Sequence, residues 1–314
     1  MDHHPILDSL RPIIASARWV TINDTRLKDV VDTIEVESLA KIDLTADQFP
    51  RDLTLNQSIG FILIYDALNF YFWGEPKWTV MKNGQPLGGS YGLLESLKTA
   101  IEDGTPLLTP EGLQHLTQAQ LADILKANTQ IPFLAERLHL LQDMGKILME
   151  QHVESWSALL EGNHHDAFTI AERLTHIFPT VFKDEIVYQN QPVRFWKRAQ
   201  LAALHLAHCI PSLNISGLTA LADYKIPNVL RQLGILEYHP TLAQRIEKKE
   251  EIASGSEEEM EIRASMVIAV DLATKQLQTS LPEVTAIQLN DIFWHIGRTL
   301  PTDNPHHRTK TIWY

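Results

Sequence analysis

Apolar residues along most of this chain recur at steps of three and four, the spacing that places them on one face of an α-helix. One such run, with Leu27, Val30, Val31 and Ile34, follows Asn23, a residue type that caps helix N-termini. The chain shows neither a regular alternation of strands with helices nor a repeat of fixed period. The sequence therefore predicts a mainly α protein.

Two short segments interrupt the helical pattern with signals for β-hairpins. Residues 78–86 contain Asn83-Gly84 between short runs with β character, which is typical of a tight hairpin turn. Residues 185–195 have a similar pattern before helical periodicity resumes. We therefore expect one or two small β-hairpins in an otherwise helical protein.

Length and charge limit the domain organisation and the class of partner. The 314 residues are 44% hydrophobic, enough for a sizeable core, and no strong linker divides them, so one domain over residues 1–314, with two helical lobes as a variant, is expected. The formal charge of -12 argues against a protein that holds duplex nucleic acid through its phosphates. A lone cysteine, Cys209, fits a reducing compartment, and we find neither an apolar leader nor a membrane-spanning run. A cytoplasmic protein without membrane contact is expected; its oligomeric state is not predicted.

A single carboxylate stands just ahead of a short apolar helix in residues 221–234, which read LADYKIPNVLRQLG. Pro227 suits the first position of that helix and Gly234 suits its end. Asp223 then lies in the turn before the helix N-terminus, where the dipole and the unpaired amides favour its ionised form. Such a carboxylate suits a nucleophile or a cation stabiliser, although a turn-forming or capping aspartate has the same pattern.

Two further positions admit both a functional and a structural interpretation. Lys197 and Arg198 are expected in the first turn of a helix, where an anionic ligand would offset their unfavourable interaction with the dipole; the alternative is a pair of solvated charges. Asn69 and Phe70 lie near an expected helix end among aromatic residues, which by themselves indicate core packing.

The fourteen histidines are dispersed along the chain. Neither His164 with His165 nor His205 with His208 has neighbouring ligands that would complete a metal site. No metal and no cofactor are therefore expected.

Six blocks of the sequence stand in the same order as in a known family. They are LNFYFWGE at 68–75, ERLHLLQDMGKIL at 136–148, FWKRAQ at 195–200, LADYKIP at 221–227, EMEIRA at 259–264 and PHHRTKTIWY at 305–314. In these blocks the chain resembles the queuosine salvage family, the queuosine 5'-phosphate N-glycosylases/hydrolases, over essentially its whole length. The resemblance implies a helical fold akin to that of the helix-hairpin-helix DNA glycosylases.

The resemblance implies hydrolysis of queuosine 5'-phosphate to queuine and ribose 5-phosphate, with this small molecule as the substrate. Asp223 would stabilise or capture the sugar cation, and Lys197, with Arg308 as second choice, would fix the 5'-phosphate. The implied substrate-binding residues are Asn69, Phe70, Leu221, Tyr224, Asn290, Asp291, His307 and Arg308.

One block departs from the family pattern. In residues 288–298, Asn290 and His295 stand where aspartates are expected, and Asp291 follows one position later. This departure leaves room for an alternative, a non-catalytic helical module that binds a modified nucleotide or tRNA. A repair glycosylase acting on polymeric nucleic acid is a third interpretation, which predicts a basic face and marked salt dependence.

Overall fold

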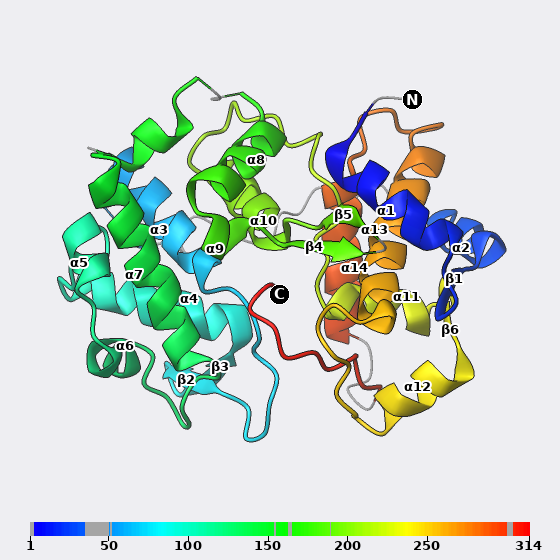
Figure 1. The fold of residues 1–314 in the computed structure, drawn as a ribbon, viewed down its shortest axis with the longest axis horizontal. Coiled ribbons are helices and arrows are strands. Elements are labelled where there is room, and N and C mark those ends of the chain that lie inside the picture. The colour runs from blue at the N-terminus through cyan, green and yellow to red at the C-terminus, as the bar shows by residue number, and fades with distance from the viewer. Residues whose placement is uncertain are drawn as a thin grey trace. The chain divides into compact units, whose positions relative to one another are not determined.

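The computed structural model describes residues 3–34, 50, 52–153, 155–162, 165–188, 190–299 and 304–314. The chain divides into two compact units, each assembled from segments that are distant in sequence (Figure 1). Unit 1 comprises Met1–Asp43, Asp184–Lys197 and Ile215–Thr311, and unit 2 comprises Leu44–Lys183, Arg198–Asn214 and Ile312–Tyr314.

Unit 1 is built around one long, deeply buried helix, α13. It packs against α1, α2, α11, α14 and β1, and its inward side chains include Ile262, Met266 and Val270. The elements of unit 1 are α1 (Pro5–Ala15), β1 (Val20–Ile22), α2 (Asp24–Val31), β4 (Glu185–Tyr188), β5 (Gln191–Arg194), α11 (Lys225–Gln232), β6 (Leu236–Tyr238), α12 (Pro240–Glu247), α13 (Glu257–Leu277) and α14 (Ala286–Thr299).

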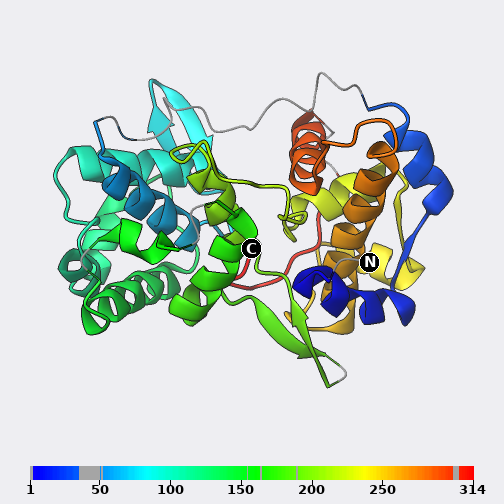
Figure 2. The ribbon, with the colours of Figure 1, turned by 90° about the horizontal axis from the view of Figure 1, so that it is seen from above.

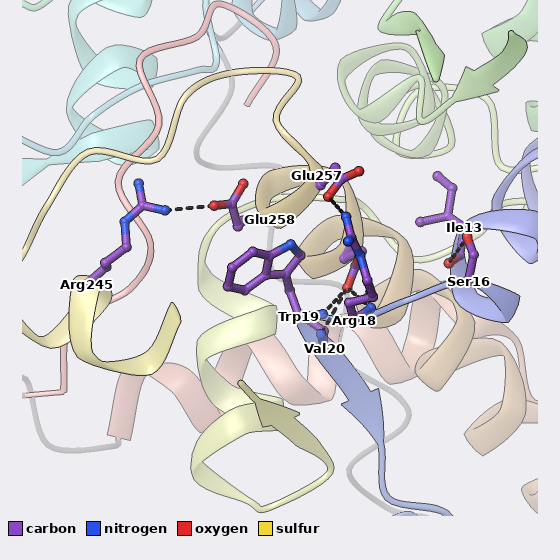
Figure 3. Close-up of polar contacts among 9 residues, drawn as sticks. Ile13, Ser16, Arg18, Trp19, Val20, Arg245, Glu257 and Glu258 are labelled. Atoms are coloured by element: carbon purple, nitrogen blue, oxygen red, sulfur yellow. Dashed lines mark hydrogen bonds and ion pairs between the residues drawn. The ribbon is translucent and has the colours of Figure 1, made fainter. Parts of the chain in front are cut away.

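Charged residues near the start of α13 hold other segments of unit 1. The carboxylate of Glu261, which is 1% exposed, accepts hydrogen bonds from the backbone N–H groups of Arg18, Trp19 and Val20 at 2.6 to 3.1 Å. Figure 3 shows these three residues at the start of β1, close to Glu257. Glu261 can be buried although it is charged, because three charge-assisted hydrogen bonds replace its contact with water.

The two strands β1 and β6 form an antiparallel pair that the sequence did not reveal. Val20 pairs with Tyr238 and Ile22 pairs with Leu236. Each strand has three residues and its partner is distant in the chain, so no hairpin turn announces the pairing.

Unit 2 is a separate helical assembly. Its elements are α3 (Leu55–Ala67), β2 (Thr79–Lys82), β3 (Gln85–Gly88), α4 (Gly89–Glu102), α5 (Pro110–Gln114), α6 (Gln118–Ile124), α7 (Leu134–Glu150), the 3₁₀ helix η3 (Trp156–Leu160), α8 (Ala167–Ile177), α9 (Pro179–Phe182) and α10 (Lys197–Leu206), whose first residue belongs to unit 1. The helix α3 is apolar on all sides and accordingly buried, and α7 runs beside α5 (Figure 1).

Both predicted hairpins are present. The β2–β3 turn is formed by Asn83 (φ 50°) and Gly84 (φ 76°), the left-handed pair that a tight two-residue hairpin requires. Figure 2 shows β4 and β5 as a narrow ribbon that projects from the helices of unit 1, and Val187 on it is 73% exposed.

The prediction of a mainly α protein with small β-hairpins is confirmed. The likeness to helix-hairpin-helix glycosylases and the single domain over residues 1–314 stay predictions. Within the described residues, none of the helices combines the length and apolar character needed to span a membrane.

Candidate active site

Asp223 lies one residue before the N-cap of helix α11 (Lys225–Gln232). Its Oδ1 accepts hydrogen bonds from the backbone N–H groups of Lys225 at 2.9 Å and Ile226 at 3.0 Å. The helix therefore begins at Lys225, two residues before Pro227, which we had expected at its first position. Pro227 is tolerated because N–H groups in the first turn have no partner within the helix.

Lys197 begins α10, as predicted, and its side chain is buried at 7% exposure. Arg198 beside it is 1% exposed, so the alternative of two solvated charges is wrong. The Lys197 ammonium is near enough to Asp223 to lower the pKa of that carboxyl. Unit 1 thus brings together the two residues predicted to carry the chemistry.

The pKa of Asp223 shifts in the direction opposite to the one expected. Burial raises it, and this outweighs the lowering by Lys197, by the Ile226 and Lys225 amides and by the Lys225 charge. The prediction from the helix terminus alone was wrong because it left out desolvation, which disfavours the charged form. Burial therefore disfavours the ionised form of Asp223, and the Lys197 charge and the two amides favour it.

The loop that carries Asp223 is fixed at its start by α14. The side-chain oxygen of Asn290 accepts a hydrogen bond from the Leu221 N–H at 2.9 Å, and its Nδ2 donates to Asp291 Oδ1 at 3.2 Å. The Asp223 N–H then donates to the Leu221 carbonyl at 2.7 Å. Leu221, Asn290 and Asp291 therefore lie together with Asp223, and Asn290 uses its oxygen to hold the loop.

Aromatic and cationic side chains lie beside the loop. The rings of Tyr224 and His306 have centroids 4.5 Å apart, and Lys225 Nζ lies 4.7 Å from the centroid of the Trp294 ring. Burial, followed by the charge of Asp223, raises the pKa of Tyr224, so its hydroxyl stays protonated. The sequence analysis named Tyr224 as a site residue but not His306. His306 and His307 are adjacent, and no sequence signal showed that His306 lies beside Tyr224.

The C-terminal block of the sequence contains a buried histidine and an arginine that is held through its backbone. His307 is 2% exposed, and burial, with smaller contributions from His306 and Arg263, lowers its pKa to about 3. The carbonyl of Arg308 accepts a hydrogen bond from the Ile252 N–H at 2.8 Å. His307 is therefore neutral at neutral pH, and Arg308 is anchored through its backbone.

Asn69 and Phe70 belong to unit 2 and make contacts there. Asn69 Nδ2 donates to Asp66 Oδ1 at 3.4 Å. The ring of Phe70 is 1% exposed, with the guanidinium carbons of Arg137 and Arg198 at 4.2 and 4.9 Å from its centroid. The base-binding roles of Asn69 and Phe70 stay predictions.

The structure gives the dispersed histidines individual surroundings. His205 Nδ1 lies 2.7 Å from Asp66 Oδ2, while His164 lies outside the described residues. In the part of the chain that the structure describes, no three or more His, Cys, Asp or Glu side chains form a group that could hold a metal ion.

Arg263 is the second residue that sequence reasoning missed. It is 3% exposed, and its Nε donates to the carbonyl of Ala222 at 3.2 Å, next to Asp223. The signal was present in the EMEIRA block, where one arginine stands between apolar residues of a helix. A cation in such a position must have buried partners.

The chain is similar to known proteins over most of its length. The profile of the family described as queuosine salvage protein matches residues 50–314. A queuosine 5'-phosphate N-glycosylase/hydrolase of Sphaerobacter thermophilus is 33% identical over 324 aligned positions, which cover 100% of this chain and 98% of the relative. Proteins of the same name from Mus musculus and Nematostella vectensis are 27% and 29% identical, over 82% and 84% of both chains respectively. The protein therefore belongs to the queuosine salvage protein family.

Proposed function

We propose that this protein hydrolyses the N-glycosidic bond of queuosine 5'-phosphate and releases queuine and ribose 5-phosphate. The observation that carries the proposal is the Asp223 carboxylate, which is fixed by two amides and lies within electrostatic reach of the buried Lys197. Two relatives, which match 100% and 82% of this chain, are named for this activity.

The role of Asp223 follows from the charge that develops during the reaction. As the bond between the anomeric carbon and the base nitrogen breaks, positive charge accumulates on the sugar. A carboxylate that is already fixed, with Oδ1 bound by the helix amides, needs no reorganisation to stabilise that charge through Oδ2. Water then supplies a hydroxyl to the anomeric carbon and a proton to the departing base.

Lys197 is the best candidate for the 5'-phosphate. His306 and His307 are neutral at neutral pH, since burial lowers their pKa values to about 4 and about 3, so they contribute no charge. A buried ammonium keeps its attraction for an anion better than an exposed one. Arg308 is the second candidate, and Leu221, Tyr224, Asn290, Asp291 and His307 are proposed to contact the substrate.

The test compares three substrates under identical conditions. The purified protein is incubated with queuosine 5'-phosphate, with queuosine, and with tRNA that contains queuosine, and free queuine is measured by mass spectrometry. We expect the highest kcat/KM for the 5'-phosphate, because binding energy from the phosphate orients the sugar for reaction.

A Lys197→Ala variant should narrow the difference in kcat/KM between nucleotide and nucleoside. Equal kcat/KM values for the two substrates with the wild-type protein would remove the reason for assigning Lys197 to the phosphate. Release of queuine from none of the three, together with binding of the nucleotide or of tRNA, would overturn the hydrolase in favour of a binding protein.

A further inference from the structure

Arg263 is a buried cation whose contacts reach beyond its own helix. Its guanidinium is 3% exposed and interacts with the carboxylates of Asp184 and Glu259 and with the ring of Phe195. A buried charge is costly unless it is fully paired, so an arginine at such a position is kept in place by several partners at once. Asp184 and Phe195 lie on the segment that leads to Lys197, and a further contact, with the carbonyl of Ala222, lies on the segment that leads to Asp223.

The first connection leads to Asp223. Nε of Arg263 donates to the carbonyl of Ala222 at 3.2 Å, and this carbonyl belongs to the same peptide group as the Asp223 N–H. That N–H in turn donates to the Leu221 carbonyl at 2.7 Å. Because a peptide group is planar, a donor at its oxygen also fixes the direction from which the Asp223 side chain leaves the loop.

The second connection leads to Lys197. Arg263 binds the Asp184 carboxylate through both terminal nitrogens, and its guanidinium carbon lies 3.8 Å from the centroid of the Phe195 ring. The backbone carbonyl of Asp184 accepts hydrogen bonds from the N–H groups of Phe195 at 3.0 Å and Trp196 at 3.4 Å. The guanidinium thus braces the turn that immediately precedes Lys197.

That turn has a conformation that needs support. Trp196 has φ 47°, in the left-handed region that bulky side chains rarely adopt, and its Nε1 donates to Glu185 at 2.9 Å. The same guanidinium that orients the Asp223 loop therefore also holds the strained turn that directs Lys197.

We propose that Arg263 is a positioning residue that sets the separation between the Asp223 carboxylate and the Lys197 ammonium. It does so as a planar fork, with Nε on Ala222, both terminal nitrogens on Asp184 and its face on Phe195. A lysine would keep the charge but has no fork and no planar face, so it cannot make these contacts together. The expected effect of Arg263 on turnover rests on the proposed function. The expected effect on the conformation of the Asp223 loop and of the turn before Lys197 does not.

The variant that isolates this role is Arg263→Lys, with Glu261→Gln as its matched control. Glu261 lies on the same helix and is similarly buried, but its carboxylate accepts hydrogen bonds from residues 18–20 instead. We expect Arg263→Lys to lower kcat/KM for queuosine 5'-phosphate by about 10- to 100-fold, the usual effect of misplacing reacting groups.

The ratio of kcat/KM for the nucleotide to that for the nucleoside separates positioning from simple loss of folded protein. Arg263→Lys should reduce this ratio, since Lys197 no longer holds the phosphate at the right distance from Asp223. A loss of folded protein lowers both values equally and leaves the ratio unchanged, as we expect for Glu261→Gln. An unchanged ratio in Arg263→Lys would overturn the proposal.

Hydrogen exchange measured by mass spectrometry tests the same inference without any substrate. Arg263→Lys should speed exchange in residues 221–226 and 193–198, and Glu261→Gln should speed it in residues 18–20. If the wild-type protein hydrolyses none of the substrates but this exchange pattern appears, the proposed function fails and the positioning role stands. If exchange in residues 221–226 is unchanged, Arg263 does not position Asp223. Should Arg263→Lys fail to fold, Asp184→Asn, which keeps the size of the partner, takes its place with the same expected pattern.

Discussion

At the scale of single residues, the site depends on a carboxylate whose charge is disfavoured by its surroundings. Burial raises the pKa of Asp223 even though Lys197 and two amides lower it. A carboxylate that is less well stabilised in the resting protein gains more when a positive charge develops opposite it. In the hydrolysis proposed above, these surroundings favour interaction of the carboxylate with the sugar cation.

The raised pKa predicts how hydrolysis depends on pH. The reaction requires the ionised carboxylate, so kcat/KM should fall as the pH falls through the pKa of Asp223. Because that pKa is raised, the midpoint of the acid limb should lie above 3.8, the ordinary value. The measurement is a pH profile of kcat/KM corrected for the folded fraction at each pH. An acid limb of the kcat/KM profile with its midpoint at or below pH 3.8 would contradict the assignment of that limb to Asp223.

His307 predicts a second effect of pH, on stability. Its pKa is lowered from 6.5 to about 3, so between these values the unfolded chain binds a proton that the folded protein does not. Stability is therefore fully present above pH 6.5 and falls as the pH is lowered toward 3, by up to about 1.4 kcal/mol per pH unit from this one group.

The corresponding variant is His307→Gln, which should flatten the dependence of the melting temperature on pH between 6.5 and 4. The exposed His176 provides the control, since His176→Gln should leave the dependence as it is in the wild-type protein. Equal pH dependence in wild type and His307→Gln would show that His307 is not held neutral by the fold.

At the scale of elements, helix packing in unit 2 depends on one close approach. A Cβ added at Gly145 in α7 would lie 2.4 Å from the backbone nitrogen of Gln114 and 2.6 Å from the carbonyl oxygen of Pro110. Backbone atoms, unlike side-chain atoms, cannot relieve such a contact by a change of rotamer. Gly145 is therefore required for α5 to lie against α7.

Gly145→Ala should lower the free energy of unfolding by about 1–3 kcal/mol, the usual cost of overpacking, despite a gain of up to about 1 kcal/mol in helix propensity. The neighbouring Lys146 is exposed, so Lys146→Ala should change stability by no more than about 0.5 kcal/mol. Urea unfolding of the wild-type protein, Gly145→Ala and Lys146→Ala measures both changes in the free energy of unfolding. Equal stability of Gly145→Ala and the wild-type protein would mean that α5 and α7 can move apart without a loss in the free energy of unfolding.

Local signals predicted the elements that depend on local structure. The capping residue Asn23, the Asn83-Gly84 turn and the helix end at Gly234 all appear as expected. The β1–β6 pair could not be predicted, because two three-residue strands distant in sequence are brought together only by packing on α13 and α11. The burial of Glu261 likewise depends on the distant residues 18–20.

At the scale of the whole molecule, the formal charge of -12 contrasts with the buried cations of the site. A protein that binds nucleic acid through six to ten phosphates loses about 10³ to 10⁵ in affinity between 50 and 200 mM salt. A negative formal charge together with the buried ammonium of Lys197 instead suits a small anionic substrate. The charge therefore agrees with the nucleotide proposed here.

Sequence alone predicted Asp223 and Lys197 as the catalytic candidates because each lies in a family block and near a helix start. It missed Arg263 and His306, whose importance comes from neighbours far along the chain: Ala222 and Asp184 for the first, Tyr224 for the second. The direction of the pKa shift of Asp223 could not be predicted from the sequence either, because desolvation depends on how several segments pack around the carboxyl.

The central claim is that the charge of Asp223 drives the cleavage, and the Asp223→Asn variant tests it most directly. The amide oxygen can still accept the two hydrogen bonds that begin α11, so the fold should be kept. A carboxyl whose pKa is raised by folding binds its proton more tightly in the folded protein, so the ionised form costs stability at neutral pH. The variant should therefore melt at the same or a higher temperature than wild type at pH 7.

The measurement is single-turnover hydrolysis of queuosine 5'-phosphate by wild type and Asp223→Asn, together with substrate affinity and melting temperature. We predict a rate lower by on the order of 10² to 10⁴, with affinity retained, because the charge acts mainly in the transition state. A rate within about threefold of wild type, or a loss that only follows the folded fraction, would make Asp223 a helix cap and contradict the mechanism.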